Sequence, residues 1–135
     1  MSHSAVTHDG AREVSVDDGL AIRDLTVAIG EREILHGISI DLIPGQITGL
    51  AGESGSGKSI TGLAMLGLLP ANARTGGEIR FGGRNVLALP ERELGKIRGQ
   101  RIGMVFQDPT ASLHPMLTIE RQLTDHLRAH TGVSK

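Results

Sequence analysis

The sequence predicts an α/β fold in which a glycine-rich loop joins a strand to a helix, beside a small antiparallel β part. Residues 20–29 and 34–42 alternate partly between apolar and polar side chains, a pattern typical of half-buried strands. Farther along, the short apolar run 47–51 leads into the Gly- and Ser-rich stretch 52–59, and the helix-forming residues 60–69 follow. The order of strand, glycine-rich loop and helix is that of an α/β unit.

Length, charge and composition limit the classes of protein to consider. The 135 residues are about one domain's worth, and the 14 basic residues nearly balance the 15 acidic ones. Net charge therefore predicts no attraction to nucleic acid or to a membrane surface. The absence of cysteine excludes disulfides and thiolate metal sites and is typical of a reducing compartment. No run approaches the roughly 18 to 20 apolar residues of a membrane-spanning helix, so any membrane connection is expected to run through a partner.

The remaining expected elements are read from turn residues and periodicity. Residues 1–18 are polar and are expected to form a flexible tail. Turns are expected at 30–33 and at Pro44-Gly45, before a buried strand at 47–51. The helix at 60–69 is expected to end at Pro70. After it we expect a loop at 71–77, a strand at 78–81, a Gly82-Gly83 turn, a returning strand at 85–89, a helix at 90–98, a buried strand at 102–106, a loop at 112–115 and a helix at 119–130.

Residues 52–59 read GESGSGKS and fit the phosphate-binding P-loop pattern G-x-x-x-x-G-K-[ST] at every fixed position. Glycines allow the backbone to wrap a polyphosphate with successive N–H groups pointing at the anion. Lys58 is expected at the β- and γ-phosphates, Ser59 on Mg²⁺, and the helix dipole adds to the attraction. The expected binding residues are Gly52, Glu53, Ser54, Gly55, Ser56, Gly57, Lys58, Ser59 and Ile60. A Gly/Ser-rich turn without a ligand is the alternative, which the flanking strand and helix disfavour; Glu53 is interpreted as an outward-facing spacer rather than a base.

Four stretches carry a resemblance to a known family. They are LHGISIDLIPGQ, which begins at Leu35, the P-loop itself, GLLP at 67–70 and IRGQRIGMVFQDPTASLHP at 97–115. Over about residues 20–135 the chain resembles the ATP-binding (ATPase) subunits of ABC transporters, and most of all the branch that imports dipeptides, oligopeptides or nickel. The P-loop is shared with other NTPases, whereas FQDP followed by SLHP is far more specific.

The resemblance implies a RecA-like P-loop NTPase core with an antiparallel β subdomain. Residues 19–135 are then expected to be the N-terminal part of the nucleotide-binding domain, truncated before the signature motif and Walker B. The resemblance also implies ATP and Mg²⁺ as cofactors, catalytic roles for Lys58 and Gln107, and Mg²⁺ contacts from Ser59 and Gln107. Gln107 matches the Q-loop residue, whose amide can contact the metal and the attacking water; an ordinary polar loop residue is the alternative.

The sequence departs from the family pattern in two ways. The position that usually stacks an aromatic ring on adenine falls near Ile29, so a preference for ATP over GTP rests on the resemblance alone. In addition, the 135 residues contain no LSGGQ-like signature, no Walker B stretch and no later switch histidine. Asp108 could end a Walker B strand, but Pro109 follows it directly and no acidic neighbour is available as a general base. A turn at Asp108-Pro109 is the favoured interpretation.

The expected function is that of an ATP-binding fragment of an ABC importer, which couples ATP binding and hydrolysis to uptake of peptides or a related small solute. The family implies a peripheral location at the cytoplasmic face of the inner membrane. It also implies membrane subunits that meet the loop after Gln107 and a second ATPase subunit in a head-to-tail dimer. Without a general base, the chain alone is not expected to hydrolyse ATP. The alternative is a non-catalytic nucleotide-binding or interaction module that is complete at this length; FQDP argues against a third class, a small-molecule kinase.

Two further groups of residues are candidates for a metal site and for a nucleic-acid patch. His126 and His130 are spaced i, i+4 on the last expected helix, but two ligands do not complete a metal site, so an exposed helix face is favoured. The basic residues of 92–101 are interleaved with Glu91 and Glu93, which favours a solvated helix over a nucleic-acid patch. No nucleic-acid partner is expected.

Overall fold

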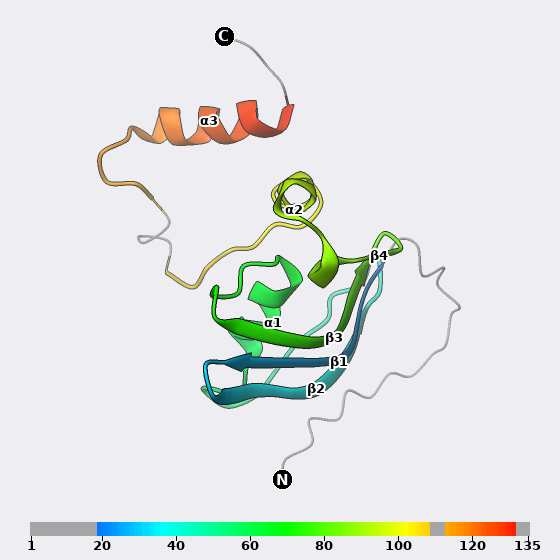
Figure 1. The fold of residues 1–135 in the computed structure, drawn as a ribbon. Coiled ribbons are helices and arrows are strands. Elements are labelled where there is room, and N and C mark those ends of the chain that lie inside the picture. Colours follow the sequence, from blue (N-terminus) through cyan, green and yellow to red (C-terminus); the bar gives the residue numbers. More distant parts are fainter. Residues whose placement is uncertain (1–18, 109–112, 132–135) are drawn as a thin grey trace. The chain divides into compact units, whose positions relative to one another are not determined.

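A computed structural model describes residues 19–108 and 113–131 of the chain (Figure 1). The chain divides into two compact units, Met1–Leu94 and Gly95–Lys135. The first unit contains a β-sheet and one helix against it, and the second contains the C-terminal helix. The tail predicted at residues 1–18 lies outside the described residues.

The sheet of the first unit has four antiparallel strands in the order β2-β1-β3-β4 (Figure 1). Their bounds are Leu20–Ile29 for β1, Arg32–Leu42 for β2, Ala73–Phe81 for β3 and Arg84–Asn85 for β4. The predicted strands at 20–29 and 34–42 are therefore confirmed, and β2 begins two residues earlier than expected. Ile29 pairs with Arg32 across a two-residue turn. Strand β1 pairs with β2 on one side, through this hairpin, and with β3 on the other.

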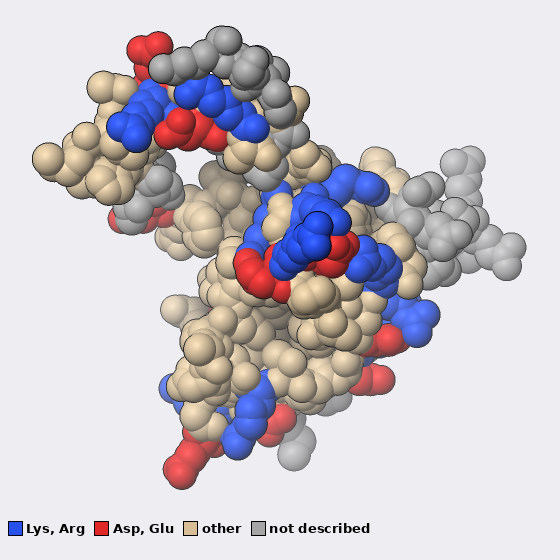
Figure 2. Space-filling model, turned by 45° about the horizontal axis from the view of Figure 1, so that its top comes forward, with Lys and Arg blue, Asp and Glu red and all other residues tan. Residues whose placement is uncertain are grey.

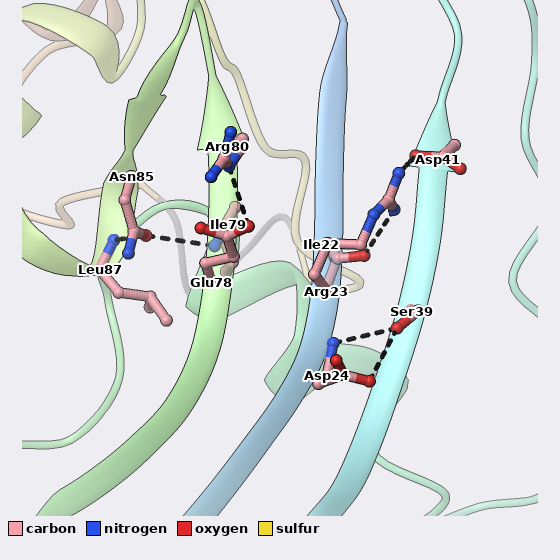
Figure 3. A network of polar contacts seen from close by, with 10 residues as sticks. All are labelled: Ile22, Arg23, Asp24, Ser39, Asp41, Glu78, Ile79, Arg80, Asn85 and Leu87. Atoms are coloured by element: carbon pink, nitrogen blue, oxygen red, sulfur yellow. Dashed lines mark hydrogen bonds and ion pairs between the residues drawn. The ribbon is translucent and has the colours of Figure 1, made fainter. Parts of the chain in front are cut away.

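A bulge in β1 explains why its alternation is only partial. Leu20 and Ile22 are buried before the bulge, and Leu25 and Val27 are buried after it, so the buried positions change from even to odd numbers. Asp24, at the bulge, has a φ of 47°. Its N–H donates to Ser39 Oγ over 3.0 Å, and the Ser39 hydroxyl donates to Asp24 Oδ1 over 3.4 Å (Figure 3). The bulge keeps all four apolar side chains in the core despite the extra residue.

The bulge depends on a glycine in the neighbouring strand. Gly77 of β3 has a φ of 76°, and a Cβ there would lie 2.3 Å from the Asp24 carbonyl oxygen and 2.4 Å from that of Arg23. Any side chain would therefore overlap the backbone of β1. Strand β3 can lie beside the bulge of β1 only because residue 77 has no Cβ.

The core of the first unit lies between one face of the sheet and the elements that cover it. Helix α1 (Lys58–Met65) packs with Thr61 and Ala64 buried, and the 3₁₀ turn η1 (Val86–Ala88) adds Val86. Asn85 Oδ1 holds η1 to the sheet, because it accepts from Leu87 N–H and from Ile79 N–H (Figure 3). The buried apolar residues are Leu20, Ile22, Leu25, Val27, Leu35, Ala64, Leu66, Ile79, Val86 and Leu94.

Two predictions near β3 are wrong in detail. Residues 73–77, expected in a loop, belong to β3 because they pair with the second half of β1. That pairing joins residues about 50 positions apart, for example Ala28 with Arg74, so local composition does not reveal it. The returning strand expected at 85–89 is only the two-residue β4, since η1 takes up the rest. The Gly82-Gly83 turn itself is confirmed by the pairing of Phe81 with Arg84.

The two buried strands predicted at 47–51 and 102–106 are wrong. Both segments are irregular, and only an isolated bridge between Arg98 and Ile102 touches the second. Ile47 and Val105 are almost fully exposed. A buried strand requires neighbouring strands to pair its N–H and C=O groups, and the described residues place none beside either run. The antiparallel part of the predicted fold is thus confirmed, whereas its parallel part does not form within the described residues.

The first two helices follow the expected positions with shifted ends. Helix α1 spans Lys58–Met65 rather than 60–69, and it ends before Pro70. Leu68 N–H donates to the Leu63 carbonyl and Gly67 N–H to that of Ala64, the pair of bonds of a Schellman cap. Helix α2 spans Glu91–Ile97 rather than the predicted 90–98, so it is shorter by one residue at each end and Pro90 directly precedes it.

The second unit contains helix α3, Ile119–Thr131, in agreement with the helix predicted at 119–130. Thr118 caps it by accepting a hydrogen bond from Arg121 N–H at Oγ1 over 3.3 Å. Within the helix, Gln122 accepts from His114 N–H and donates to the His114 carbonyl, which fixes the loop that leads into α3. The apolar side chains of α3, at Ile119, Leu123 and Leu127, share one face and are exposed.

Charge is mixed over the surface. Figure 2 shows Lys and Arg side chains interspersed with Asp and Glu on the face that it displays. Arg84 and Glu93 form one such pair at 3.2 Å, and Arg23 and Asp41 form another across β1 and β2 (Figure 3). Within the described ranges, no helix is long and apolar enough to cross a membrane.

Candidate functional site: the P-loop

The predicted P-loop lies in the first unit and leads directly into α1. Its middle forms a turn in which Ser56 N–H donates to the Glu53 carbonyl over 3.2 Å. Gly55, the third residue of this turn, has a φ of 82°, which a glycine adopts without strain. The loop residues 52–56 are exposed, whereas Gly57 is buried. The loop therefore presents an open backbone on one side and is anchored at its C-terminal end.

Gly57 is the residue at which the loop ends and helix α1 begins. It is the N-cap of α1, with a φ of 92° and ψ of 3°. Its carbonyl accepts both the Thr61 N–H, over 2.9 Å, and the Thr61 hydroxyl, over 3.0 Å. The left-handed conformation of Gly57 turns the chain sharply, so that α1 starts at once with Lys58.

The first turn of α1 leaves backbone donors for a ligand. The first intrahelical bond is that of Thr61 N–H, so the N–H groups of Lys58, Ser59 and Ile60 have no acceptor within the helix. No side chain caps this end of the helix, and its first turn carries no acidic residue. Three donors and the positive end of the helix dipole therefore meet at the loop, an arrangement suited to an anion.

Lys58 lies across the loop. Its Nζ donates to the Gly52 carbonyl over 2.8 Å, to the Glu53 carbonyl over 2.7 Å and to Ser56 Oγ over 3.2 Å. These three bonds use all the protons of the ammonium group. The positive charge is thus held against the loop by acceptors from three of its residues.

The other predicted binding residues occupy the rim of this loop. Ser59 is exposed at the second position of α1 and Ile60 is half-buried at the third. Glu53 and Ser54 are exposed, and Glu53 contributes its carbonyl to Lys58. Gly52 lies close to Ser56, whose Oγ would be 2.6 Å from a Cβ at residue 52. The nine residues predicted from the motif therefore form one continuous structural unit.

Two residues that support the loop were not predicted from the sequence. Leu35 of β2 lies against Gly57: its Cδ2 would be 2.3 Å from a Cβ there. Thr61 is buried and donates to the Gly57 carbonyl. Thr61 could have been found from its place one helical turn after Gly57. Nothing in the spacing of the sequence pointed to Leu35, because its contact is made through the fold.

The remaining predicted residues lie elsewhere. Ile29 is half-buried at the end of β1, where it pairs with Arg32 and Ala73. Gln107 and Asp108 are exposed in an irregular segment of the second unit, and no strand leads into them. The Walker B reading of Asp108 therefore lacks the strand that it needs, while Pro109 lies outside the described residues.

The histidine pair belongs to α3. His126 and His130 both fall on that helix, but their side chains lie outside the described part of the structure. Among the described side chains, no three His, Asp or Glu residues come together in a group that could hold a metal ion.

Comparison with known proteins assigns the chain to a family. The family described as ABC transporter matches residues 35–134. The oligopeptide transport ATP-binding protein OppD of Escherichia coli is 43% identical over 120 residues, which cover 86% of this chain and 36% of that protein. The peptidoglycan transport ATP-binding protein YejF of Agrobacterium fabrum is 43% identical over 129 residues, 91% of this chain and 24% of that protein.

The name of a third relative specifies dipeptide transport. The dipeptide transport ATP-binding protein DppD of Lactococcus lactis is 45% identical over 108 residues, which cover 78% of this chain and 31% of that protein. The chain thus spans between about a quarter and just over a third of the length of these relatives. Because the family match extends over most of its residues, including the P-loop and Gln107, the chain belongs to the ABC transporter family.

Proposed function

We propose that this chain binds ATP and Mg²⁺ through the P-loop, as the nucleotide-binding part of an importer for peptides or a related small solute. The observation that carries the proposal is the junction of loop and helix: the loop carbonyls of Gly52 and Glu53 hold the Lys58 ammonium, and α1 starts at once after Gly57 with N–H groups that have no acceptor within the helix. A phosphate chain offers the acceptors and the negative charge that this group of donors requires.

The bonds of Lys58 suggest how the phosphates are accepted. Its three protons are directed at Gly52, Glu53 and Ser56, so phosphate oxygens must replace some of these acceptors. The exchange is favourable because a hydrogen bond between two charged groups is stronger than one from an ammonium group to a neutral carbonyl. The Ser59 hydroxyl, exposed beside Lys58, would hold Mg²⁺ on the same phosphates.

The transport role is proposed from the relatives. Their names specify ATP-binding proteins for oligopeptides, dipeptides and peptidoglycan. We extend this role to the chain, with a peripheral place at the cytoplasmic face of the membrane and membrane subunits that meet the loop after Gln107. Within a RecA-like core and a head-to-tail dimer, Gln107 would contact Mg²⁺ and the attacking water. Hydrolysis coupled to uptake is then proposed for the whole assembly, and nucleotide binding for this chain.

Replacement of Lys58 tests the proposal. Lys58→Ala should weaken binding of Mg·ATP about 10- to 150-fold, since a hydrogen bond to a charged group contributes about 1.5 to 3 kcal/mol. Isothermal titration calorimetry on the full chain measures the affinity. Lys96→Ala, which removes a lysine of α2 outside the loop, is the matched control and should change the affinity less than about twofold. Equal affinities of the wild type and Lys58→Ala would refute the assignment of the P-loop.

A further inference from the structure

We infer that Leu35 of β2 is a positioning residue for the nucleotide site: its side chain sets the place of Gly57 and thereby directs the N–H groups of the first turn of α1. This inference rests on the proposed function of the P-loop and adds a residue outside the motif. It connects the antiparallel sheet directly to the chemistry of the loop.

The Leu35 side chain occupies the place that a Cβ on Gly57 would take. A Cβ built on Gly57 would lie 2.3 Å from Leu35 Cδ2, 3.6 Å from its Cγ and 3.7 Å from the Ile34 carbonyl oxygen. These are the three nearest heavy atoms, so two of the three contacts come from the Leu35 side chain. A side chain at residue 57 would therefore overlap Leu35, whose side chain lies beside the glycine.

Leu35 is itself held firmly. Only 3% of its surface is exposed, and its backbone pairs with that of Val27 in β1, an inner strand of the sheet. This backbone pairing fixes the position of Leu35 in the sheet. The packed side chain of Leu35 can thus limit how closely Gly57, at the end of the loop, approaches the sheet.

The position of Gly57 matters because everything that would touch the phosphates follows from it. Gly57 is the N-cap of α1, and its carbonyl accepts the Thr61 N–H and hydroxyl. If the isobutyl group of Leu35 were removed, Gly57 could sink toward the sheet. The N–H groups of Lys58, Ser59 and Ile60 would then change direction, although no residue that touches the ligand had been altered.

A leucine elsewhere in the core separates this role from ordinary packing. Leu25 of β1 is fully buried in the same unit, and none of its atoms is among the three nearest to Gly57. Leu25→Ala and Leu35→Ala delete the same atoms from two buried positions of the same unit. Both should lower the stability of the unit, but only the second should disturb the loop.

The test is the affinity of the full chain for Mg·ATP, measured by calorimetry together with thermal unfolding. We expect Leu35→Ala to weaken binding about tenfold or more and Leu25→Ala to change it less than about twofold under conditions where both are folded. Leu35→Met, which keeps the volume, should restore the affinity to within about threefold of the wild type. If Leu35→Ala does not fold, Leu35→Val against Leu25→Val repeats the comparison with a smaller truncation.

The outcomes are distinct. Equal affinities of the Leu35 and Leu25 variants, with binding by the wild type intact, would overturn the positioning role and leave the proposed function standing. A failure of Leu35→Met to restore binding while the protein is folded would also overturn it. A wild-type chain that binds no Mg·ATP would instead refute the function of the P-loop, and the positioning role with it.

Discussion

The sheet of the first unit and helix α3 of the second differ in how far their apolar side chains are buried. In the sheet, several large residues such as Leu25 and Ile79 are fully buried beneath α1 and η1, although Ile47 in the irregular part of the same unit is exposed. In the second, the apolar face of α3 is open, and Leu123 is 62% exposed. In the described part of the second unit, Gln122 pairs with His114, only eight residues away.

The difference explains where the chemistry is located. The P-loop belongs to the unit whose strands pair over long distances in the sequence, and Leu35 anchors it to that sheet. Backbone donors can be directed at a ligand only when their support is rigid. Gln107 lies in the other unit, in an irregular and exposed segment. The described structure thus supports binding by the loop more strongly than it supports a catalytic role for Gln107.

The largest effect is expected at Gly77, where the first unit tolerates no side chain. Gly77→Ala should lower the free energy of unfolding by at least about 3 kcal/mol, because it adds a left-handed alanine and an overlap with the β1 carbonyls. Gly82→Ala is a matched control, since Gly82 also has a positive φ, of 55°, but no atom lies within 4 Å of its Cβ position. This control should cost about 1 kcal/mol. Urea unfolding followed by circular dichroism measures both; equal losses would show that the bulge does not require residue 77 to lack a side chain.

The smallest effect is expected on the open face of α3. Leu123→Ser should change the free energy of unfolding by about 0.5 kcal/mol or less, because the side chain is already largely in water. The same substitution at Leu25 should cost about 3 kcal/mol or more, since it leaves a cavity and buries a hydroxyl. A loss above about 2 kcal/mol at Leu123 would show that this face is covered in solution and would remove the contrast between the units.

Much of the antiparallel sheet could be predicted from the sequence, because its first two strands form a local hairpin with alternating side chains. The bounds of β1 agree with the prediction at both ends. The start of β3 could not be predicted, since Thr75, Gly76 and Gly77 are typical of a loop and become a strand only by pairing with β1. The apolar run 47–51 failed for the opposite reason: its composition suits a buried strand, but no neighbouring strand is present in the described residues to pair with it.

The turn and the helix start of the P-loop could be predicted because they are encoded within eight consecutive residues, and nucleotide binding by these residues stays a prediction. Glycines at fixed positions give the turn and the N-cap, and Lys58 and Ser59 follow at once. The support beneath it could not be predicted, since Leu35 is 22 positions away from Gly57 and meets it only when β2 has formed. The motif contains the residues that are expected to contact the ligand, whereas the residue that supports them is brought there only by the fold.

The most direct test of nucleotide binding at this loop is a titration of the ¹⁵N-labelled chain with Mg·ATP, followed by ¹H–¹⁵N correlation spectra. The backbone amides of Gly55, Gly57, Lys58, Ser59 and Ile60 should show the largest chemical-shift changes, because their N–H groups would meet the phosphates. The same amides should stay in place in Lys58→Ala at equal nucleotide concentration. Changes confined to other parts of the chain, or none at millimolar Mg·ATP, would contradict binding at the P-loop.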